Sequence, residues 1–143
     1  FSQQFINLLS SNGQQLRSFV VGDFNHDGFY DIYASYYWST FAPDKLWLNN
    51  GNNNESLPII LKGWEGNRNA IGAKITLLQG NNKQVREIRA GESYGISNSH
   101  CIIFGLGLNT SIDELEVTWP DGKNDKISGV QAGKLVLINE GRN

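Results

Sequence analysis

The stretch from Asp23 to Asp31 contains the residues best placed to do chemistry in this chain. Four of its side chains offer oxygen donors at alternate or near-alternate positions: Asp23, Asn25, Asp27 and Asp31. The backbone carbonyl of Phe29 offers a further oxygen, and Gly28 allows a sharp turn. Ca²⁺ prefers six to eight oxygen ligands, and carboxylates this close together repel one another unless a cation lies between them. We therefore expect these five residues to bind Ca²⁺; the alternative is a polar Asx-rich turn without a metal.

This loop begins like an EF-hand but does not continue as one. The twelfth position, where an EF-hand has a bidentate Glu, is Ala34. The flanking segments Ser18–Val21 and Tyr30–Tyr36 are rich in β-branched and aromatic residues, a composition that favours strands, whereas an EF-hand needs helices on both sides. We therefore predict that the loop joins two strands of a sheet.

Short strand patterns continue along the chain, separated by turns rich in Gly, Asn and Asp. The later predicted strands cover residues 45–48, 58–62, 73–78, 84–89, 114–119 and 134–138, and we expect the apolar last strand to be well buried. Mixed charges indicate that residues 84–89 form an exposed or an edge strand. Alternation points Leu115, Val117 and Trp119 inward. The pattern predicts an all-β chain: a propeller-blade-like calcium-loop unit over residues 1–55, then a compact antiparallel β-sandwich or barrel over residues 56–143.

Composition excludes several functional classes. The chain has 143 residues and a formal net charge of −2, which argues against a nucleic-acid surface. It contains no apolar run long enough to cross a bilayer. One cysteine and two separated histidines do not make a tetrahedral zinc site.

Catalytic candidates are few. Cys101 lies in an apolar, strand-like run and is expected to pack as a small hydrophobe. His26 occupies a non-ligand position of the acidic loop, and His100 flanks an apolar strand. Ser97 and Ser99 lie near His100, but no acidic residue accompanies them. We therefore expect a protein that is not an enzyme.

Two regions resemble known families. The acidic loop is similar to the D-x-N/D-x-D-G-x-x-D pattern of the FG-GAP/VCBS repeat. In the second unit an ordered set of motifs resembles the ASPIC/UnbV domain, which follows such repeats in cartilage acidic protein-like proteins and in many secreted bacterial proteins. These motifs are GNRNAIGAK (residues 66–74), GESY (91–94), FGLG (104–107) and LEVTWPDG (115–122). The resemblance implies an extracellular, non-catalytic module that acts in adhesion or partner binding.

Aromatic residues crowd the segment after the acidic loop. Four of them are candidate partner contacts: Tyr36, Tyr37, Trp38 and Trp47. Consecutive residues of a strand point to opposite faces, so at least one ring of the first three must lie outside the core or at an interface. Packing between the units is one interpretation; the other is a platform for a protein or glycan at the cell surface or in the matrix, with self-association as a further expectation.

Arg68 lies in a Gly/Asn-rich loop just before a predicted strand. Its planar guanidinium could tie loop carbonyls or a carboxylate together, which is the structural interpretation. The functional alternative is a ligand or partner contact through the same donors.

Overall fold

The computed structural model describes residues 15–37, 43–64, 66–92 and 94–141, and every regular element in them is a β-strand. The strands are β1 (Gln15–Gly22), β2 (Asp31–Tyr37), β3 (Lys45–Trp47), β4 (Glu55–Lys62), β5 (Lys74–Gln79), β6 (Asn82–Glu87), β7 (Ile102–Gly107), β8 (Glu114–Thr118), β9 (Asn124–Ile127) and β10 (Val136–Asn139). The predicted all-β class is confirmed. None of the described segments forms a helix able to cross a membrane.

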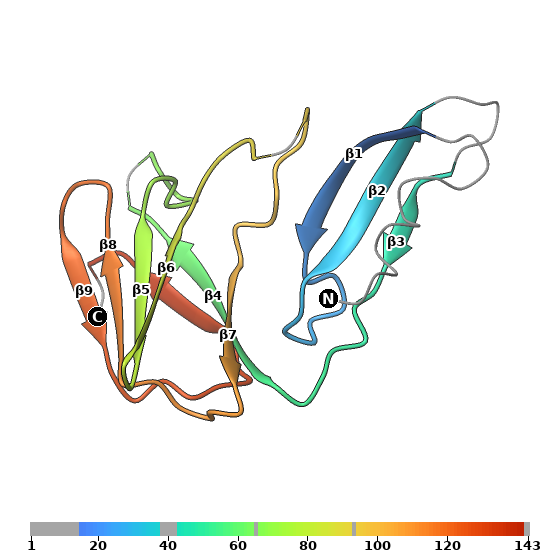
Figure 1. Ribbon diagram of the computed structural model, residues 1–143. Helices are drawn as coiled ribbons and strands as arrows, with labels where there is room; N and C mark the ends of the chain where they lie inside the picture. Colours follow the sequence, from blue (N-terminus) through green and yellow to red (C-terminus); the bar gives the residue numbers. More distant parts are fainter. Residues whose placement is uncertain (1–14, 38–42, 65, 93, 142–143) are drawn as a thin grey trace.

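The strands form three sheets, and Figure 1 shows the first one set apart from the other two. The first sheet has the order β1-β2-β3 and is antiparallel throughout. The other two have the orders β10-β4-β7 and β6-β5-β8-β9 and together form a β-sandwich. The connection between β3 and β4 links the first sheet to this sandwich.

The first sheet is built on the β1–β2 hairpin. Val21 pairs with Ile32 and Gly22 with Asp31, so the acidic loop begins directly after the last residue of β1. On the other side of β2, Ile32 pairs with Trp47 of β3. The prediction that the loop joins two strands is therefore confirmed, and paired strands hold both of its ends.

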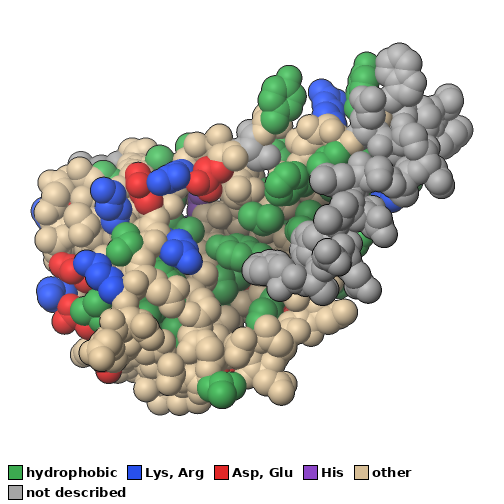
Figure 2. Space-filling model, in the orientation of Figure 1, with side chains coloured by type: hydrophobic (Ala, Val, Ile, Leu, Met, Phe, Trp, Pro, Cys, Tyr) green, Lys and Arg blue, Asp and Glu red, His purple; other side chains and the backbone are tan. Residues whose placement is uncertain are grey.

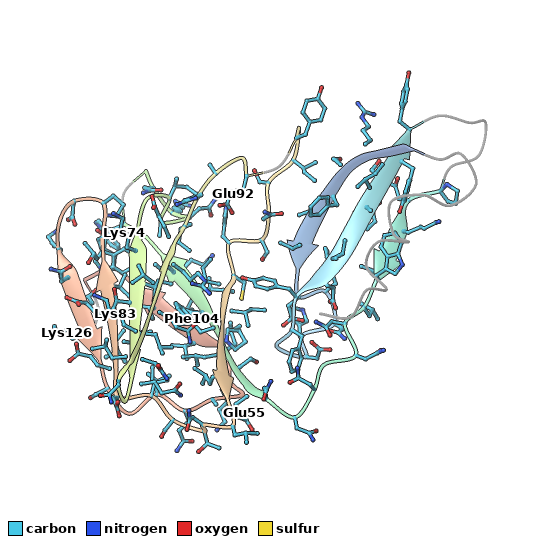
Figure 3. All side chains as sticks on the ribbon, in the orientation of Figure 1. Glu55, Lys74, Lys83, Glu92, Phe104 and Lys126 are labelled. Carbon is cyan, nitrogen blue, oxygen red and sulfur yellow. The ribbon has the colours of Figure 1, made fainter. Side chains whose placement is uncertain are left out.

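The sandwich encloses the main hydrophobic core. Its fully buried members come from both sheets: Leu57, Ile59, Ile75, Leu77, Phe104, Leu115, Val117 and Ile138. Phe104 points from β7 into the space between the sheets (Figure 3), and its ring lies 5.7 Å from the guanidinium of Arg86. Leu115, Val117 and Trp119 are all buried, as their alternation predicts. Burial of this apolar surface is the principal stabilising contribution to the second unit.

The last strand differs from the prediction in two ways. β10 pairs in parallel with β4, so the sandwich is not purely antiparallel, and the described strands form no closed barrel. The predicted strand 134–138 carries a run of apolar residues, yet β10 lies at a sheet edge. Ile138 is buried against the core, whereas Leu135 and Leu137 are 58% and 54% exposed. An apolar run therefore did not mean burial on both faces.

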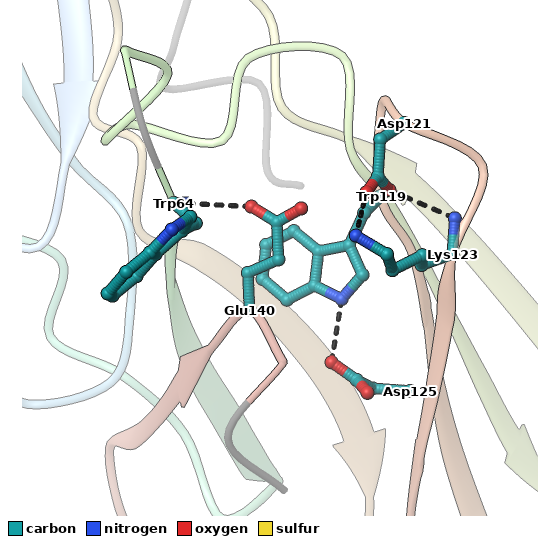
Figure 4. Close-up of polar contacts among 6 residues, drawn as sticks. All are labelled: Trp64, Trp119, Asp121, Lys123, Asp125 and Glu140. Atoms are coloured by element: carbon teal, nitrogen blue, oxygen red, sulfur yellow. Dashed lines mark hydrogen bonds and ion pairs between the residues drawn. The ribbon is translucent and has the colours of Figure 1, made fainter.

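At the edges of the four-stranded sheet, one strand is as predicted and one is new. β6 is an edge strand, as its mixed charges indicate. The sequence does not predict β9, because Asn124–Ile127 has only one β-branched residue. It forms because the turn after Trp119 brings it beside β8, where Asp125 pairs with Val117. Asp125 Oδ2 also accepts a 2.7 Å hydrogen bond from the indole of Trp119 (Figure 4).

Candidate metal centre

The acidic loop is held by hydrogen bonds from its own backbone to its carboxylates. Asp23 Oδ1 accepts from the N–H of Asp27 at 3.1 Å, and Asp23 Oδ2 accepts from the N–H of Gly28 at 2.9 Å. Asp27 Oδ1 accepts from the N–H of Phe29 at 2.9 Å. The turn also requires positive φ angles of 61° at His26 and 84° at Gly28. Side-chain capping of this kind is what Asx residues do in tight turns.

Asp31 is the anchor of the loop. Its side chain is 1% exposed. Asp31 Oδ2 accepts from the N–H of Phe24 at 2.8 Å, and Oδ1 accepts from the N–H of Asn49 at 2.8 Å. A buried carboxylate requires such donors, and here they tie the loop to the segment that follows β3.

The donor set suits a hard cation in its chemistry. The side chains of Asn25 and Asp27 lie side by side, and the amide nitrogen of Asn25 donates to Asp27 Oδ2 at 2.8 Å. Asn25 and Asp27 are exposed and Asp23 is half-buried, so a cation could reach them. A carboxylate oxygen can accept more than one bond, so the observed hydrogen bonds leave capacity for a metal.

The carboxylates are nevertheless not gathered around one point. Among the described residues, no group of three or more His, Cys, Asp or Glu side chains is placed to hold a metal ion. Of the predicted ligands, the structure brings Asp23, Asn25 and Asp27 into one hydrogen-bonded loop, while Asp31 faces inward. Phe29 is half-buried and follows directly on the loop glycine. Coordination would require Asp23, Asn25 and Asp27 to turn toward a common centre.

The loop also lies against the second unit. The hydroxyl of Tyr30 donates to the carbonyl of Cys101 at 3.2 Å and accepts from the N–H of Ile103 at 3.0 Å. Burial raises the pKa of Tyr30 above its ordinary value of 10.0. At Gly28 an added Cβ would collide with the hydroxyl of Ser56 on β4. The acidic loop is therefore part of the junction between the two units.

A second set of contacts joins the end of β1 to the segment before β7. The N–H of Val21 donates to Asn98 Oδ1 at 3.1 Å, and the carbonyl of Val21 accepts from the N–H of Ser99 at 3.1 Å. β1 is an edge strand of its sheet, so these bonds satisfy backbone groups that β2 cannot reach.

A cleft of about 360 Å³ lies between the loop and the β10-β4-β7 sheet. Its lining includes Asp23 and Asp27 from the loop, Pro58 from β4, and Cys101 and Leu135. Burial raises the pKa of the Cys101 thiol above its ordinary value of 9.0, and the nearby charge of Asp23 adds to this. The thiol therefore stays protonated at neutral pH, which disfavours nucleophilic chemistry.

Residues 63–143, more than half of the chain, match the family model described as ASPIC and UnbV. The chain belongs to the ASPIC and UnbV family. No curated protein matches it in sequence. The matched segment begins directly after β4, so the first sheet, the acidic loop and β4 all precede the ASPIC and UnbV segment.

The predicted aromatic contacts divide between the two faces of the first sheet. Tyr36 is 8% exposed, and its ring lies 6.4 Å from that of half-buried Trp47 and 5.1 Å from Lys45 Nζ. Tyr37 points the other way and is 53% exposed. Trp38 lies outside the described residues. The expectation that these rings cannot all face inward is confirmed for Tyr36 and Tyr37.

Hydrophobic side chains are also exposed elsewhere on the first sheet. Figure 2 shows charged side chains over the sandwich on this face, whereas hydrophobic ones lie toward the β1-β2-β3 sheet. Phe19, Tyr33 and Leu46 are 47%, 39% and 49% exposed. Exposed apolar surface of this kind is typical of interaction sites.

Within the ASPIC and UnbV segment, Asn67 makes the clamp that one of the two interpretations gives to Arg68. Asn67 Nδ2 donates to the carbonyl of Ile71 at 3.0 Å, and Asn67 Oδ1 accepts from the N–H of Ile71 at 3.0 Å. The side chain of Arg68 is exposed and makes no hydrogen bond or ion pair with the described residues. The structural interpretation of Arg68 is therefore wrong, since a short amide closes this turn without a long guanidinium.

The serines that the sequence offers as catalytic candidates accept hydrogen bonds from the backbone. Ser97 Oγ accepts from the N–H of Gly91 at 3.3 Å, and Ser99 Oγ accepts from the N–H of Cys101 at 3.1 Å. His26 is exposed on the loop. His100 Nε2 is buried and has no hydrogen-bond partner among the described residues.

Sequence reasoning missed a pocket of about 500 Å³ in the ASPIC and UnbV segment. Its lining joins Lys62 at the end of β4, Trp64 and Arg68 in the following loop, and Asn139 and Glu140 at the end of β10. The proximity of Trp64 to Arg68 is the only local signal in the sequence. The rest depends on the parallel pairing of β10 with β4.

Proposed function

We propose that this chain is a secreted, calcium-stabilised and non-catalytic module for adhesion or protein–protein interaction. The observation that carries the proposal is the position of the acidic loop. Its oxygen-rich residues lie at the junction of the two units, where Tyr30 and Gly28 contact the sandwich. A cation bound by Asp23, Asn25, Asp27, Asp31 and the carbonyl of Phe29 would stabilise the loop and, through it, this junction.

The resemblance of the loop to the FG-GAP/VCBS repeat supports the same proposal. Such a repeat would present the first sheet as a blade whose exposed aromatic and apolar side chains meet a partner. Tyr37 and Leu46 are about half exposed on this sheet, as an interaction surface requires. We therefore propose a protein at the cell surface or in the matrix, or a second copy of this chain, as the partner.

Calcium-dependent melting tests the metal part of the proposal. Extracellular modules bind Ca²⁺ with dissociation constants of about 10⁻⁴–10⁻³ M, so about 10 mM Ca²⁺ should stabilise the fold by about 1.4–2.7 kcal/mol relative to EGTA. Asp27→Asn keeps an oxygen to accept the Phe29 N–H but removes a charge, so this variant should lose most of the stabilisation. An equal melting temperature of the parent in Ca²⁺ and in EGTA would refute the calcium site.

The alternative is a carbohydrate-binding accessory module that uses exposed aromatics. It is favoured by Trp64 and Tyr37, which are 57% and 53% exposed. A glycan array in Ca²⁺ and in EGTA separates the alternatives, because strong and selective sugar binding supports the accessory module. Light scattering tests self-association, which should appear as a dimer or larger species if two copies cover the first sheet.

A further inference from the structure

The pocket at the ends of β4 and β10 combines side chains that the fold brings together from distant parts of the chain. Lys62 pairs with Asn139 in the parallel register of the two strands, so both side chains point to the same face. The preceding residues of each strand, Leu61 and Ile138, are buried in the core. Lys62 and Asn139 therefore point away from the core, and the pocket of about 500 Å³ opens on that outer face.

Two cations on this pocket are available to a ligand. Lys62 and Arg68 are both exposed. The ion pairs of the described residues involve Arg89, Lys123 and Lys126 instead. Neither cation forms an ion pair with a carboxylate of the described residues, so both can attract an anion. The planar guanidinium can bind a carboxylate through two parallel hydrogen bonds.

Among the described residues that line this pocket, Glu140 is the one carboxylate, and the backbone orients it. Glu140 Oε2 accepts a 2.7 Å hydrogen bond from the N–H of Trp64 (Figure 4), and the N–H of Glu140 donates to the carbonyl of Lys62 at 2.9 Å. Glu140 is half-buried, and its second oxygen makes no hydrogen bond within the described part of the chain. This oxygen can accept a hydrogen bond from a ligand hydroxyl, whereas it would repel a second anionic group.

Trp64 adds a flat apolar surface to this polar set. Its side chain lines the pocket and is 57% exposed. At the neighbouring Gly66, no atom outside the two adjacent residues lies within 4 Å of the position where a Cβ would lie. An exposed indole beside polar groups suits a ligand with one apolar face and a polar rim.

We propose that this pocket binds an acidic sugar, specifically a ring that carries a carboxylate, as a uronic acid unit does. Arg68 and Lys62 bind the sugar carboxylate, and Trp64 stacks on the apolar face of the ring. Asn139 and the second oxygen of Glu140 bind ring hydroxyls. A neutral sugar has no charge for the two cations to bind, and a phosphate group has no apolar face to stack on the indole. A carboxylate of a peptide offers no hydroxyl to Glu140.

The inference goes beyond the proposed function, because it does not depend on the acidic loop. It names a site and a ligand class for the carbohydrate alternative. If calcium fails to stabilise the protein, the sugar pocket is unaffected; if the pocket fails, the calcium proposal still stands.

Isothermal titration calorimetry on the full chain tests the pocket with three probes. These are a galacturonic acid oligosaccharide, a neutral galactose oligosaccharide of equal length, and a poly-glutamate peptide. We expect measurable binding of the first and at least about tenfold weaker binding of the other two, since hydrogen bonds to charged groups are stronger than those between neutral groups. Binding should be equal in Ca²⁺ and in EGTA.

Variants then assign the binding to the named residues. Arg68→Ala and Trp64→Ala should each weaken binding of the acidic oligosaccharide about tenfold or more, and Arg68→Lys should restore only part of it. Lys134→Ala, which removes an exposed lysine that does not line the pocket, is the matched control and should bind like the parent. Thermal melting of each variant verifies that it is folded.

Three results would overturn the inference. Equal binding of the neutral sugar would show that the two cations do not contribute to recognition. Equal binding of poly-glutamate would show that the pocket binds carboxylates in general. Unchanged affinity in folded Arg68→Ala and Trp64→Ala proteins would show that the oligosaccharide binds elsewhere on the molecule.

Discussion

Replacing Tyr30 by Phe tests whether the acidic loop and the sandwich form one stable junction. The change removes a single oxygen and keeps the ring in place. That oxygen accepts from the N–H of Ile103 at 3.0 Å and donates to the carbonyl of Cys101 at 3.2 Å. Tyr30→Phe therefore leaves a donor and an acceptor at the edge of the sandwich without their partner.

The expected loss of stability follows from these two bonds. A typical intramolecular hydrogen bond contributes about 0.5–1.5 kcal/mol, so two of them contribute about 1–3 kcal/mol. Tyr30 is 37% exposed, so water can replace part of what is lost. We expect Tyr30→Phe to lower the free energy of unfolding by about 1–2 kcal/mol, the lower part of that range. For a chain of this size the melting temperature should fall by roughly 3–8 °C.

Urea unfolding, followed by tryptophan fluorescence, measures this loss, and Tyr33→Phe is the matched control. The hydroxyl of Tyr33 donates to Asp44 at 2.6 Å, but the pair lies exposed on the first sheet. Exposed polar pairs contribute little, so this control should unfold at nearly the same urea concentration as the parent. Parent-like stability of Tyr30→Phe, or an equal loss in Tyr33→Phe, would refute the reasoning.

The same variant should change how stability depends on alkaline pH. Burial raises the pKa of Tyr30 in the folded protein above its ordinary value of 10.0. The unfolded chain therefore releases this proton first, and the stabilisation present below pH 10.0 is lost as pH rises toward the higher folded pKa. Above pH 10.0, Tyr30→Phe should lose stability less steeply than the parent. The hydrogen bond to Asp44 raises the pKa of Tyr33 as well, but this effect is common to both proteins.

Three further substitutions test the loop, the core and the clamp. Gly28→Ala should lower the free energy of unfolding by more than about 1–2 kcal/mol, because the φ of Gly28 is 84° and an added Cβ would meet Ser56. Gly80→Ala is the control, because Gly80 has a φ of 56° and open space around it. In the same urea titration, this control should show only the cost of the backbone conformation. Phe104→Ala should lower the free energy of unfolding by about 3–5 kcal/mol, because its ring is fully buried; a loss below about 1 kcal/mol would contradict this core assignment. Asn67→Ala should cost about 1–3 kcal/mol by thermal melting, since two backbone groups of Ile71 lose their partner, and an unchanged melting temperature would show that the clamp contributes nothing.

Local sequence patterns determined most of the strand content and the main features of the loop. Alternation placed Leu115, Val117 and Trp119 in the core, and mixed charges indicated an exposed or an edge strand at residues 84–89. The Asx residues and Gly28 indicated a tight turn between strands, and the turn is there with its carboxylates capping backbone N–H groups. Such features depend on near neighbours in the chain, so side-chain periodicity and turn chemistry suffice to predict them.

Long-range pairing decided the rest. β10 lies in parallel beside β4, although some 70 residues separate them, and this pairing creates the pocket between Lys62 and Glu140. The hydroxyl of Tyr30 accepts from the N–H of Ile103 across the junction, and Asn67 rather than Arg68 makes the clamp. Both contacts depend on which side chain reaches a given backbone group in the folded chain. The direction of the loop carboxylates is decided in the same way, by the backbone donors around them. No local pattern encodes these distances, since they arise only when separate strands pack around a common core.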